Sequence, residues 1–271
     1  MKTRIVTGLV AFALLVAVLL LPPIALYGAF SVLCAMGIYE MFAVTGLKKH
    51  RELLVAAMAF GAVAPFFRHA YGHWLWAVAT AVWVLLIVVV SLKKLDTLCI
   101  QDVGLASFLT LLISIGLSCI AYCRTLNEYG IFYLMLALII AWGSDIGAYF
   151  TGTVCGRHKL CPRISPKKTV EGFIGGWVSG ILLCLLWVFI WNRCCPEGLA
   201  PVSFWQVALV ALFLSPLSVL GDLFASLIKR QYDTKDYGSI MPGHGGVMDR
   251  FDSLTLVGPF LFAILHITAL V

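Results

Sequence analysis

The chain has 271 residues, of which 62% are hydrophobic and 12% are charged, and its mean hydropathy is +1.00. Soluble domains carry about twice that share of charged residues, so the composition excludes a soluble enzyme, a disordered chain and a secreted disulfide scaffold. The formal net charge of +6 would suit nucleic acid, but the basic residues lie between apolar runs, where they set membrane topology. No nucleic acid is therefore expected as a partner.

Nine apolar runs follow one another along the chain. Crossing a bilayer core takes about 20 apolar residues in a helix. The runs lie near residues 4–22, 24–46, 52–69, 73–92, 104–123, 130–150, 173–191, 204–224 and 254–271. We therefore expect an all-α, polytopic integral membrane protein with about nine transmembrane helices.

The basic residues predict which way the helices run. Sixteen of the 19 Lys and Arg residues lie in gaps on the side of the N-terminus, and only Arg68, Arg124 and Arg193 lie on the other side. Positively charged loops stay in the cytoplasm, which places the N-terminus inside. The first run has no signal-peptide cleavage site after it, so we expect it to be retained. Compactness and the lack of targeting extensions favour a bacterial cytoplasmic (inner) membrane.

Polar residues are unevenly distributed along this single membrane domain of residues 1–271. No repeat or linker divides it. Residues 1–125 form a five-span N-terminal part, whereas residues 126–271 hold two long polar loops near 151–172 and 225–253. Functional residues concentrate on loops held by a rigid scaffold, so we expect the chemistry in this second, catalytic part.

Three acidic residues, Glu40, Asp145 and Asp222, fall inside predicted spans. Such acids are costly to bury and normally face a polar cavity with a partner. Pro216, before Asp222, is expected to kink its helix and free a carbonyl group. The alternative is that each acid only hydrogen-bonds a neighbouring helix; for Glu40, pairing with a loop cation is equally favoured.

The loop near 151–172 combines five basic residues with hydroxyls and glycines. Such a loop at a helix entrance suits a phosphate-bearing ligand. The alternative is that the basic residues of this loop only contact anionic lipid headgroups. The composition of the loop does not decide between these two roles. Cys155, His158 and Cys161 form a C-x2-H-x2-C pattern, but a zinc site is disfavoured because no second ligand pair follows at a recognised spacing.

The loop near 225–253 places acids beside glycines. Asp249 and Asp252 are three residues apart and share one face of a helix. Together with Asp222 they offer the hard oxygen ligands that Mg²⁺ accepts. Gly245 and Gly246 allow backbone amides to approach phosphate oxygens. A solvated loop with incidental ion pairs is the disfavoured alternative.

The stretch from Ser226 to Asp252 resembles the C-terminal signature of the phosphatidate cytidylyltransferase (CDP-diacylglycerol synthase) family. The matching positions are Ser226, Lys229, Arg230, Lys235, Asp236, Gly238, Pro242, His244, Gly245, Gly246, Asp249, Arg250 and Asp252. An upstream run from Ser144 through Asp145 to Gly172 is similar to a second block of that family. The two blocks cover roughly the last 130 residues.

The resemblance implies a membrane enzyme, often a homodimer, that joins CTP and phosphatidate into CDP-diacylglycerol and pyrophosphate. It implies Mg²⁺ as cofactor, with a second cation left open. The metal ligands would be Asp222 and Asp249, with Asp145 and Asp252 completing the shell. The catalytic residues would be Asp222, Asp249, Lys229 and Arg250. The substrate-binding residues would be Ser165, Lys167, Lys168, Thr169, Arg230, Lys235, Asp236, His244, Gly245 and Gly246. The active site would face the cytoplasm.

Three alternative functions remain open. An ion-coupled transporter also carries intramembrane acids and broken helices, often at corresponding positions in two halves. Here the first five spans hold only one acid, Glu40, which disfavours this alternative. A related cytidylyltransferase acting on an ether or isoprenoid phospholipid, or a CTP-dependent lipid kinase, would use similar loops. A lipid-binding scaffold would need no paired carboxylates.

Overall fold

Helices make up almost all of the regular structure. The computed structural model describes residues 8, 13–19, 21–67, 73–94, 96–194, 198–240, 245–268 and 270. Within these ranges, seven helices are long and apolar enough to cross a membrane. The predicted class, an all-α polytopic membrane protein, is confirmed. The count of nine and the orientation of the N-terminus stay predictions.

Two of the nine predicted spans are not among these seven helices. The first, near 4–22, is described only at residues 8, 13–19 and 21–22, and the rest of it lies outside the described residues. In place of the third, near 52–69, helix α3 covers only Arg51–Val63, and the short 3-10 turn η2 (Ala64–Phe66) follows it. Pro65 in this turn has no N–H to continue an α-helical ladder. The 13 residues of α3 rise only about 20 Å, against a bilayer core of about 30 Å.

The chain divides into two compact units, and each is described here by itself. One unit comprises Met1–Tyr122 and Gln231–Phe251, and the other comprises Cys123–Arg230 and Asp252–Val271. In this division the segment Gln231–Phe251 groups with the N-terminal helices. The predicted single domain, with parts 1–125 and 126–271, stays a prediction.

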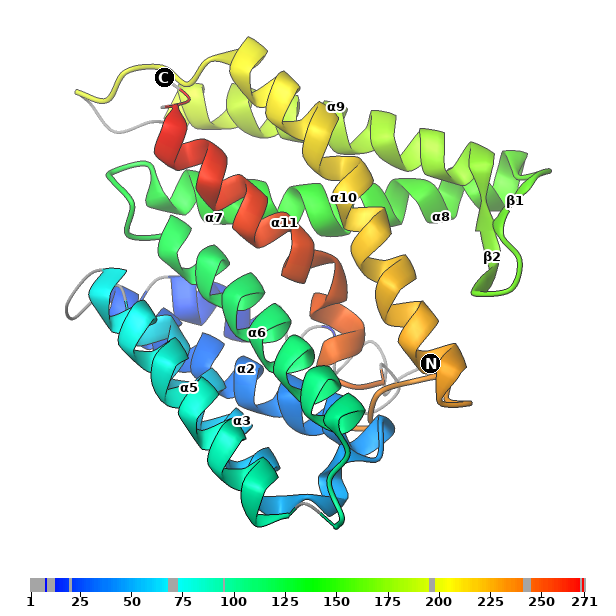
Figure 1. The fold of residues 1–271 in the computed structure, drawn as a ribbon. Helices are drawn as coiled ribbons and strands as arrows, with labels where there is room; N and C mark the ends of the chain where they lie inside the picture. Colours follow the sequence, from blue (N-terminus) through cyan, green and yellow to red (C-terminus); the bar gives the residue numbers. More distant parts are fainter. Residues whose placement is uncertain are drawn as a thin grey trace. The chain divides into compact units, whose positions relative to one another are not determined.

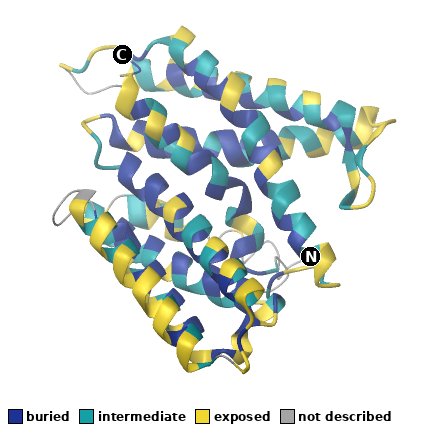
Figure 2. Cartoon of the chain, viewed as in Figure 1, coloured by how far each residue is buried: buried dark blue, intermediate teal, exposed yellow. Residues whose placement is uncertain are grey.

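The first unit is built around α2 (Pro23–Val44), which packs against α3. Helix α3 also packs against α5 (His73–Lys93), and α6 (Ile100–Cys123) follows in the chain (Figure 1). Between α2 and α3 lies the short turn η1 (Leu47–Lys49). Much of α5 is exposed in Figure 2. Its mean hydropathy of 2.6 over the span makes it suited to contact lipid.

The second unit begins with one long span that has a change of helix type inside it. This span consists of α7 (Gly130–Leu138), the π-helical turn η3 (Ile139–Gly143) and α8 (Ser144–Cys155). Strands β1 (Lys159–Cys161) and β2 (Ser165–Thr169) then form an antiparallel hairpin. Helices α9 (Val170–Cys194), α10 (Phe204–Gln231) and α11 (Met248–Ile267) complete the fold (Figure 1). The predicted loops are therefore shorter than expected, since α8, α10 and α11 extend into them.

Small residues bring α8 and α9 into close contact. A Cβ atom added at Gly176 would lie 2.6 Å from the Ser144 carbonyl oxygen and 2.8 Å from the Ala148 Cβ. Real Cβ atoms essentially never come this close, so only glycine fits there without a shift. Such small-residue stripes let membrane helices approach at backbone distance. The two helices thereby fix both ends of the hairpin between them.

Helix α10 continues through Pro216 because a neighbouring helix compensates for the missing N–H. A proline inside a helix leaves the carbonyl four residues earlier without its usual donor. Here that carbonyl belongs to Leu212, and the Trp177 Nε1 of α9 donates to it at 2.9 Å. The freed carbonyl expected from the sequence is thus present and satisfied, and α10 runs on to Asp222.

Candidate functional site

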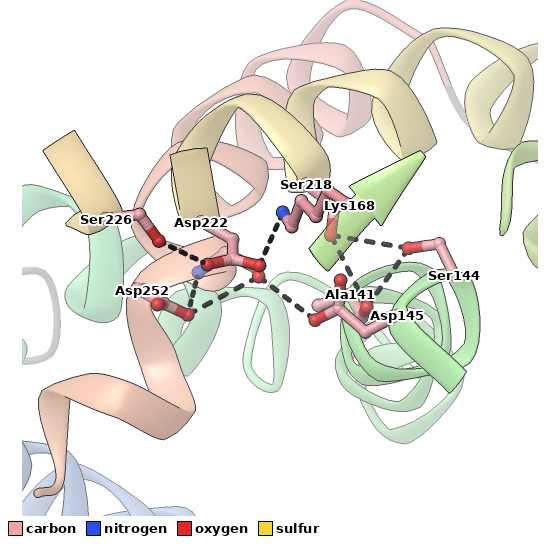
Figure 3. A network of polar contacts seen from close by, with 9 residues as sticks. Ala141, Ser144, Asp145, Lys168, Ser218, Asp222, Ser226 and Asp252 are labelled. Carbon is pink, nitrogen blue, oxygen red and sulfur yellow. Dashed lines mark hydrogen bonds and ion pairs between the residues drawn. The ribbon is translucent and has the colours of Figure 1, made fainter. Parts of the chain in front are cut away.

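Three acids and a lysine gather in the second unit (Figure 3). Asp145 comes from α8, Asp222 from α10, Asp252 from α11 and Lys168 from β2. The Lys168 Nζ lies 2.6 Å from the Asp222 Oδ2. The Nζ is buried and, apart from this ion pair, has no hydrogen bond of normal geometry. The Ser226 Oγ, one turn further along α10, donates to the Asp222 Oδ1 at 3.3 Å.

Ser253 connects the other two acids. Its backbone N–H donates to the Asp252 Oδ1 at 2.8 Å. Its Oγ lies 3.3 Å from the Asp145 Oδ2 and 3.5 Å from the Asp252 Oδ1. A hydroxyl carries one hydrogen, so it donates to one of these carboxylates at a time. Ser253 was not among the predicted site residues, although it directly follows Asp252, which was.

The charges in this cluster are not balanced. Asp252 is only 6% exposed, and it is repelled by both Asp145 and Asp222 while Lys229 attracts it. Three carboxylates, of which Asp252 is buried, therefore lie near Lys168 and Lys229. Carboxylates gathered in this way favour binding of a further positive charge.

Buried hydroxyls support the start of α8. Ser144 and Ser218 are both fully buried, with their Oγ atoms 3.3 Å apart. The two hydroxyls also donate to the Ala141 carbonyl, at 3.0 and 3.4 Å. This carbonyl lies in the π-helical turn η3, a feature common at functional sites. The turn directly precedes α8, whose second residue is Asp145, and it was not expected from the sequence.

The oxygen ligands fit Mg²⁺ only if substrate completes the coordination shell. Within the described ranges, no three His, Cys, Asp or Glu side chains lie close enough to hold a metal ion. Mg²⁺ is commonly held by one or two carboxylates together with waters and substrate phosphates. Asp222 and Asp252, which lie close enough to repel each other, are suited to this kind of shared site.

The two adjacent lysines of β2 have different surroundings. Successive side chains of a strand alternate between its faces. Lys168 contacts Asp222, whereas Lys167 is exposed. Ser165 is half-buried in the same strand, where it pairs with Cys161.

Thr169 caps α9. Its Oγ1 accepts the N–H of Gly172 at 3.1 Å, the contact expected of a helix N-cap. The side chain is buried, and a Cβ on Gly152 would lie 3.0 Å from the same Oγ1. Thr169 therefore stabilises the start of α9, and its binding of substrate stays a prediction.

Glu171 closes the base of the hairpin, a role that the sequence analysis did not assign. Its carboxylate accepts the backbone N–H groups of Arg157 at 3.0 Å and of His158 at 3.1 Å. It also contacts the His158 Nδ1 at 2.6 Å. In the C-x2-H-x2-C pattern, this imidazole nitrogen faces a carboxylate, and Cys155 and Cys161 are free thiols.

The end of α10 carries two further predicted residues. Arg230 donates from its Nε to the Ile164 carbonyl at 3.0 Å, which ties the end of α10 to the turn of the hairpin. Lys229 acts on Asp252 through its charge. Both basic residues of the predicted Lys-Arg pair therefore act within the second unit, one on the hairpin and one on the acidic cluster.

The other predicted residues belong to the first unit. Lys235, Asp236 and Arg250 are exposed there. His244 lies outside the described residues, as do Pro242 and Gly243. Asp222 and Asp249, predicted to share a metal, fall in different units, so their pairing stays a prediction.

Asp249 organises the segment before α11. Its Oδ2 accepts backbone N–H groups from Tyr237 and Gly246, both at 2.9 Å. Gly245 has φ +86°, a conformation that residues with a side chain rarely adopt. Glu40 of α2 accepts two more N–H groups from the same segment, at Val247 and Met248. Local sequence patterns gave no sign of this contact.

Known proteins resemble this chain along almost its whole length. Residues 2–268 match the model of the cytidylyltransferase family. The phosphatidate cytidylyltransferase of Bacillus subtilis (strain 168) is 36% identical, over 98% of this chain and 97% of its own length. That of Staphylococcus haemolyticus (strain JCSC1435) is 42% identical over 49% of this chain and 48% of its own. That of Staphylococcus aureus (strain COL) is 41% identical over 54% of each. With a family match and a 36% identical relative that both span nearly every residue, the chain belongs to the cytidylyltransferase family, whose members are nucleotidyltransferases.

Proposed function

We propose that this protein transfers the cytidylyl group of CTP to phosphatidate, forming CDP-diacylglycerol and pyrophosphate. Relatives that match 98% and 49% of this chain are phosphatidate cytidylyltransferases. The observation that carries the proposal is the contact of Lys168 with Asp222 inside a three-carboxylate cluster. Such a cluster of acids and cations is suited to binding phosphates together with a divalent cation.

The reaction depends on positioning of the substrates more than on covalent catalysis by the protein. A phosphate oxygen of the lipid attacks the α-phosphorus of CTP, and a new P–O bond forms. The bond from the α-phosphorus to its bridging oxygen breaks, and pyrophosphate leaves with the electron pair. The attacking phosphate is already ionised near neutral pH, so no general base is required. Alignment of two anions and neutralisation of their charge therefore dominate.

The residues of the second unit divide into two roles in this proposal. Asp222 and Asp252 would hold Mg²⁺, and Asp145 would orient the shell through Ser253. Bound Mg²⁺ would neutralise phosphate oxygens. Lys168 and Lys229, which now face the carboxylates, would bind the phosphates that approach them.

The remaining family positions are assigned by their charge and exposure. Arg230, Lys235 and Arg250 would bind triphosphate or lipid phosphate, with Lys167 and Ser165 at the edge of the hairpin. Gly245, Gly246 and His244 would offer donors to phosphate, and Asp236 would orient a neighbouring cation. Asp249 would hold the segment that carries several of these residues.

We further propose the bacterial cytoplasmic membrane as the location, with the substrate-binding residues on the cytoplasmic side. Bacterial relatives and the 16 basic residues in gaps on one side support this orientation. CTP is cytosolic, which requires the same side. Homodimer formation is proposed on the family resemblance alone, and light scattering of the purified protein tests it.

Pyrophosphate release by detergent-purified protein tests the function. CTP, phosphatidate and Mg²⁺ are each omitted in turn, and Asp222→Asn serves as the inactive control. Release that needs all three components and is lost in the variant is the expected result. Release with only an ether or isoprenoid phospholipid would change the acceptor, and no release with any acceptor would contradict the proposal and favour a transporter.

A further inference from the structure

Glu40 of α2 lies at the start of another helix. It is only 2% exposed. Its Oε1 accepts the N–H of Val247 at 2.9 Å, and its Oε2 accepts the N–H of Met248 at 2.8 Å. The first N–H groups of a helix have no partner within the helix, and the positive end of the helix dipole attracts a carboxylate. Glu40 therefore caps α11, although it is far away in sequence.

Two glycines that precede α11 in the chain lie close to this carboxylate. A Cβ at Gly246 would lie 2.5 Å from the Glu40 Oε2, and one at Gly238 would lie 2.6 Å from the Oε1. Both distances are too short for any real Cβ atom. Two glycines of the family signature are thus required by the close approach of one acid.

A second carboxylate holds the same segment. Asp249 binds the N–H groups of Tyr237 and Gly246, and Gly246 also lies against Glu40. The two acids together take four backbone N–H groups of this segment. Both Glu40 oxygens bind backbone N–H groups, and its pairing with a loop cation stays a prediction.

We propose that Glu40 is a positioning residue for the cytidylyl transfer described above. It binds the N–H groups of Val247 and Met248 at the start of α11. It thereby positions Asp236, Asp249 and Arg250, which lie close by in the chain. Through Glu40, a residue of the N-terminal part would contribute to the reaction. The inference rests on the proposed function, but the contact itself can be tested without it.

The kinetic test compares Glu40→Gln with Thr45→Val. The glutamine keeps one acceptor but turns an NH₂ group toward the other N–H. Thr45 is a matched control, since it is also a buried polar residue near the end of α2 and its Oγ1 bonds only its own helix, at the Met41 carbonyl. We expect Glu40→Gln to lower kcat/KM at least about tenfold per folded molecule, and Thr45→Val to stay within about twofold. Equal losses in both variants, or wild-type kcat/KM in Glu40→Gln, would overturn the proposal.

Hydrogen exchange separates the anchor from the activity. In Glu40→Gln the amides of Val247 and Met248 should exchange at least about tenfold faster, whereas those of α9 should not change. Unchanged exchange at these two amides would overturn the anchor, whatever the activity. Faster exchange in the variant, together with wild-type protein that does not turn over CTP and phosphatidate, would instead contradict the proposed function.

A double-mutant cycle tests the close approach at Gly238. Gly238→Ala should lower kcat/KM in the wild type, because the new methyl group meets the Glu40 carboxylate. In the Glu40→Ala background the space is free, so the same substitution should cause little further loss. Losses that simply add would show that Gly238 and Glu40 act independently, against the proposal.

Discussion

The Lys168 Nζ lies 2.6 Å from the Asp222 Oδ2, so a strand of the hairpin after α8 meets the middle of α10 at one ion pair. Lys167, its neighbour in the strand, is exposed. The two lysines were expected from the sequence to share one role. The alternation of the strand gives them different surroundings, and different consequences on substitution.

Lys168→Ala should therefore impair the enzyme far more than Lys167→Ala. Loss of Lys168 leaves Asp222 without its cation and removes a charge from the acidic cluster. We expect kcat/KM to fall at least about a hundredfold in Lys168→Ala, and the KM for CTP or phosphatidate to rise only a few-fold in Lys167→Ala. Steady-state pyrophosphate release measures both. Equal effects of the two substitutions would mean that the strand does not place them differently during turnover.

Metal removal should abolish turnover reversibly. Two carboxylates alone hold Mg²⁺ weakly, and the shell would be completed by substrate phosphates. We expect EDTA to stop pyrophosphate release and added Mg²⁺ to restore it, with no change in thermal unfolding of the protein without substrate. Asp252→Asn should raise the Mg²⁺ concentration needed for half-maximal rate. A structural ion would instead change the unfolding temperature when it is chelated.

Asp249→Asn distinguishes two roles for one residue. The family resemblance implies a metal ligand, whereas the structure shows an acceptor for the Tyr237 and Gly246 amides. We expect lower turnover, faster hydrogen exchange at these two amides and an unchanged Mg²⁺ requirement. If the Mg²⁺ requirement rises while exchange stays at the wild-type rate, Asp249 is a ligand rather than a support.

The main features that could be predicted from the sequence are those with a local or compositional signal. Apolar runs predicted the seven long helices found, and acids inside those runs predicted where polar clusters form. The end of α3 near Pro65 also had a local signal, since proline interrupts the helical ladder, but the run of apolar residues outweighed it. The N-cap role of Thr169 could have been predicted from its place before α9. It was not considered, because Thr169 was assigned to substrate binding.

Contacts between distant segments could not be predicted in this way. Glu40 and Val247 contact each other only because the fold brings them together. Neither segment has a sequence pattern that predicts this contact. The different surroundings of Lys167 and Lys168 depend on a hairpin, in a segment that was predicted to be a loop. The π-helical turn before Asp145 could not be predicted either, because a uniformly apolar run shows no hydrophobic periodicity that would mark it.

Close packing of α8 and α9 predicts a stability effect. A side chain at Gly176 would meet the Ser144 carbonyl and the Ala148 methyl group, whereas a Cβ at Gly104 of α6 meets nothing within 4 Å. We expect Gly176→Val to destabilise the protein by about 1–3 kcal/mol, and Gly104→Ala to be neutral or slightly stabilising. Thermal unfolding in detergent measures both. Equal stability of the two variants would contradict the tight approach of the helices.

The membrane topology can be tested with two reporters, and the short α3 makes the test informative. Nine spans with an inside N-terminus place a reporter after Val271 outside and a reporter inserted in the hairpin, between Cys161 and Ser165, inside. Because α3 has 13 residues, it is the span at greatest risk of not crossing the bilayer. If α3 did not cross, each later segment would change sides, and the hairpin with its basic residues would lie outside, against the charge rule. We therefore expect the outside and inside results for the two reporters, and both reporters reversed would show that one span before the hairpin is missing.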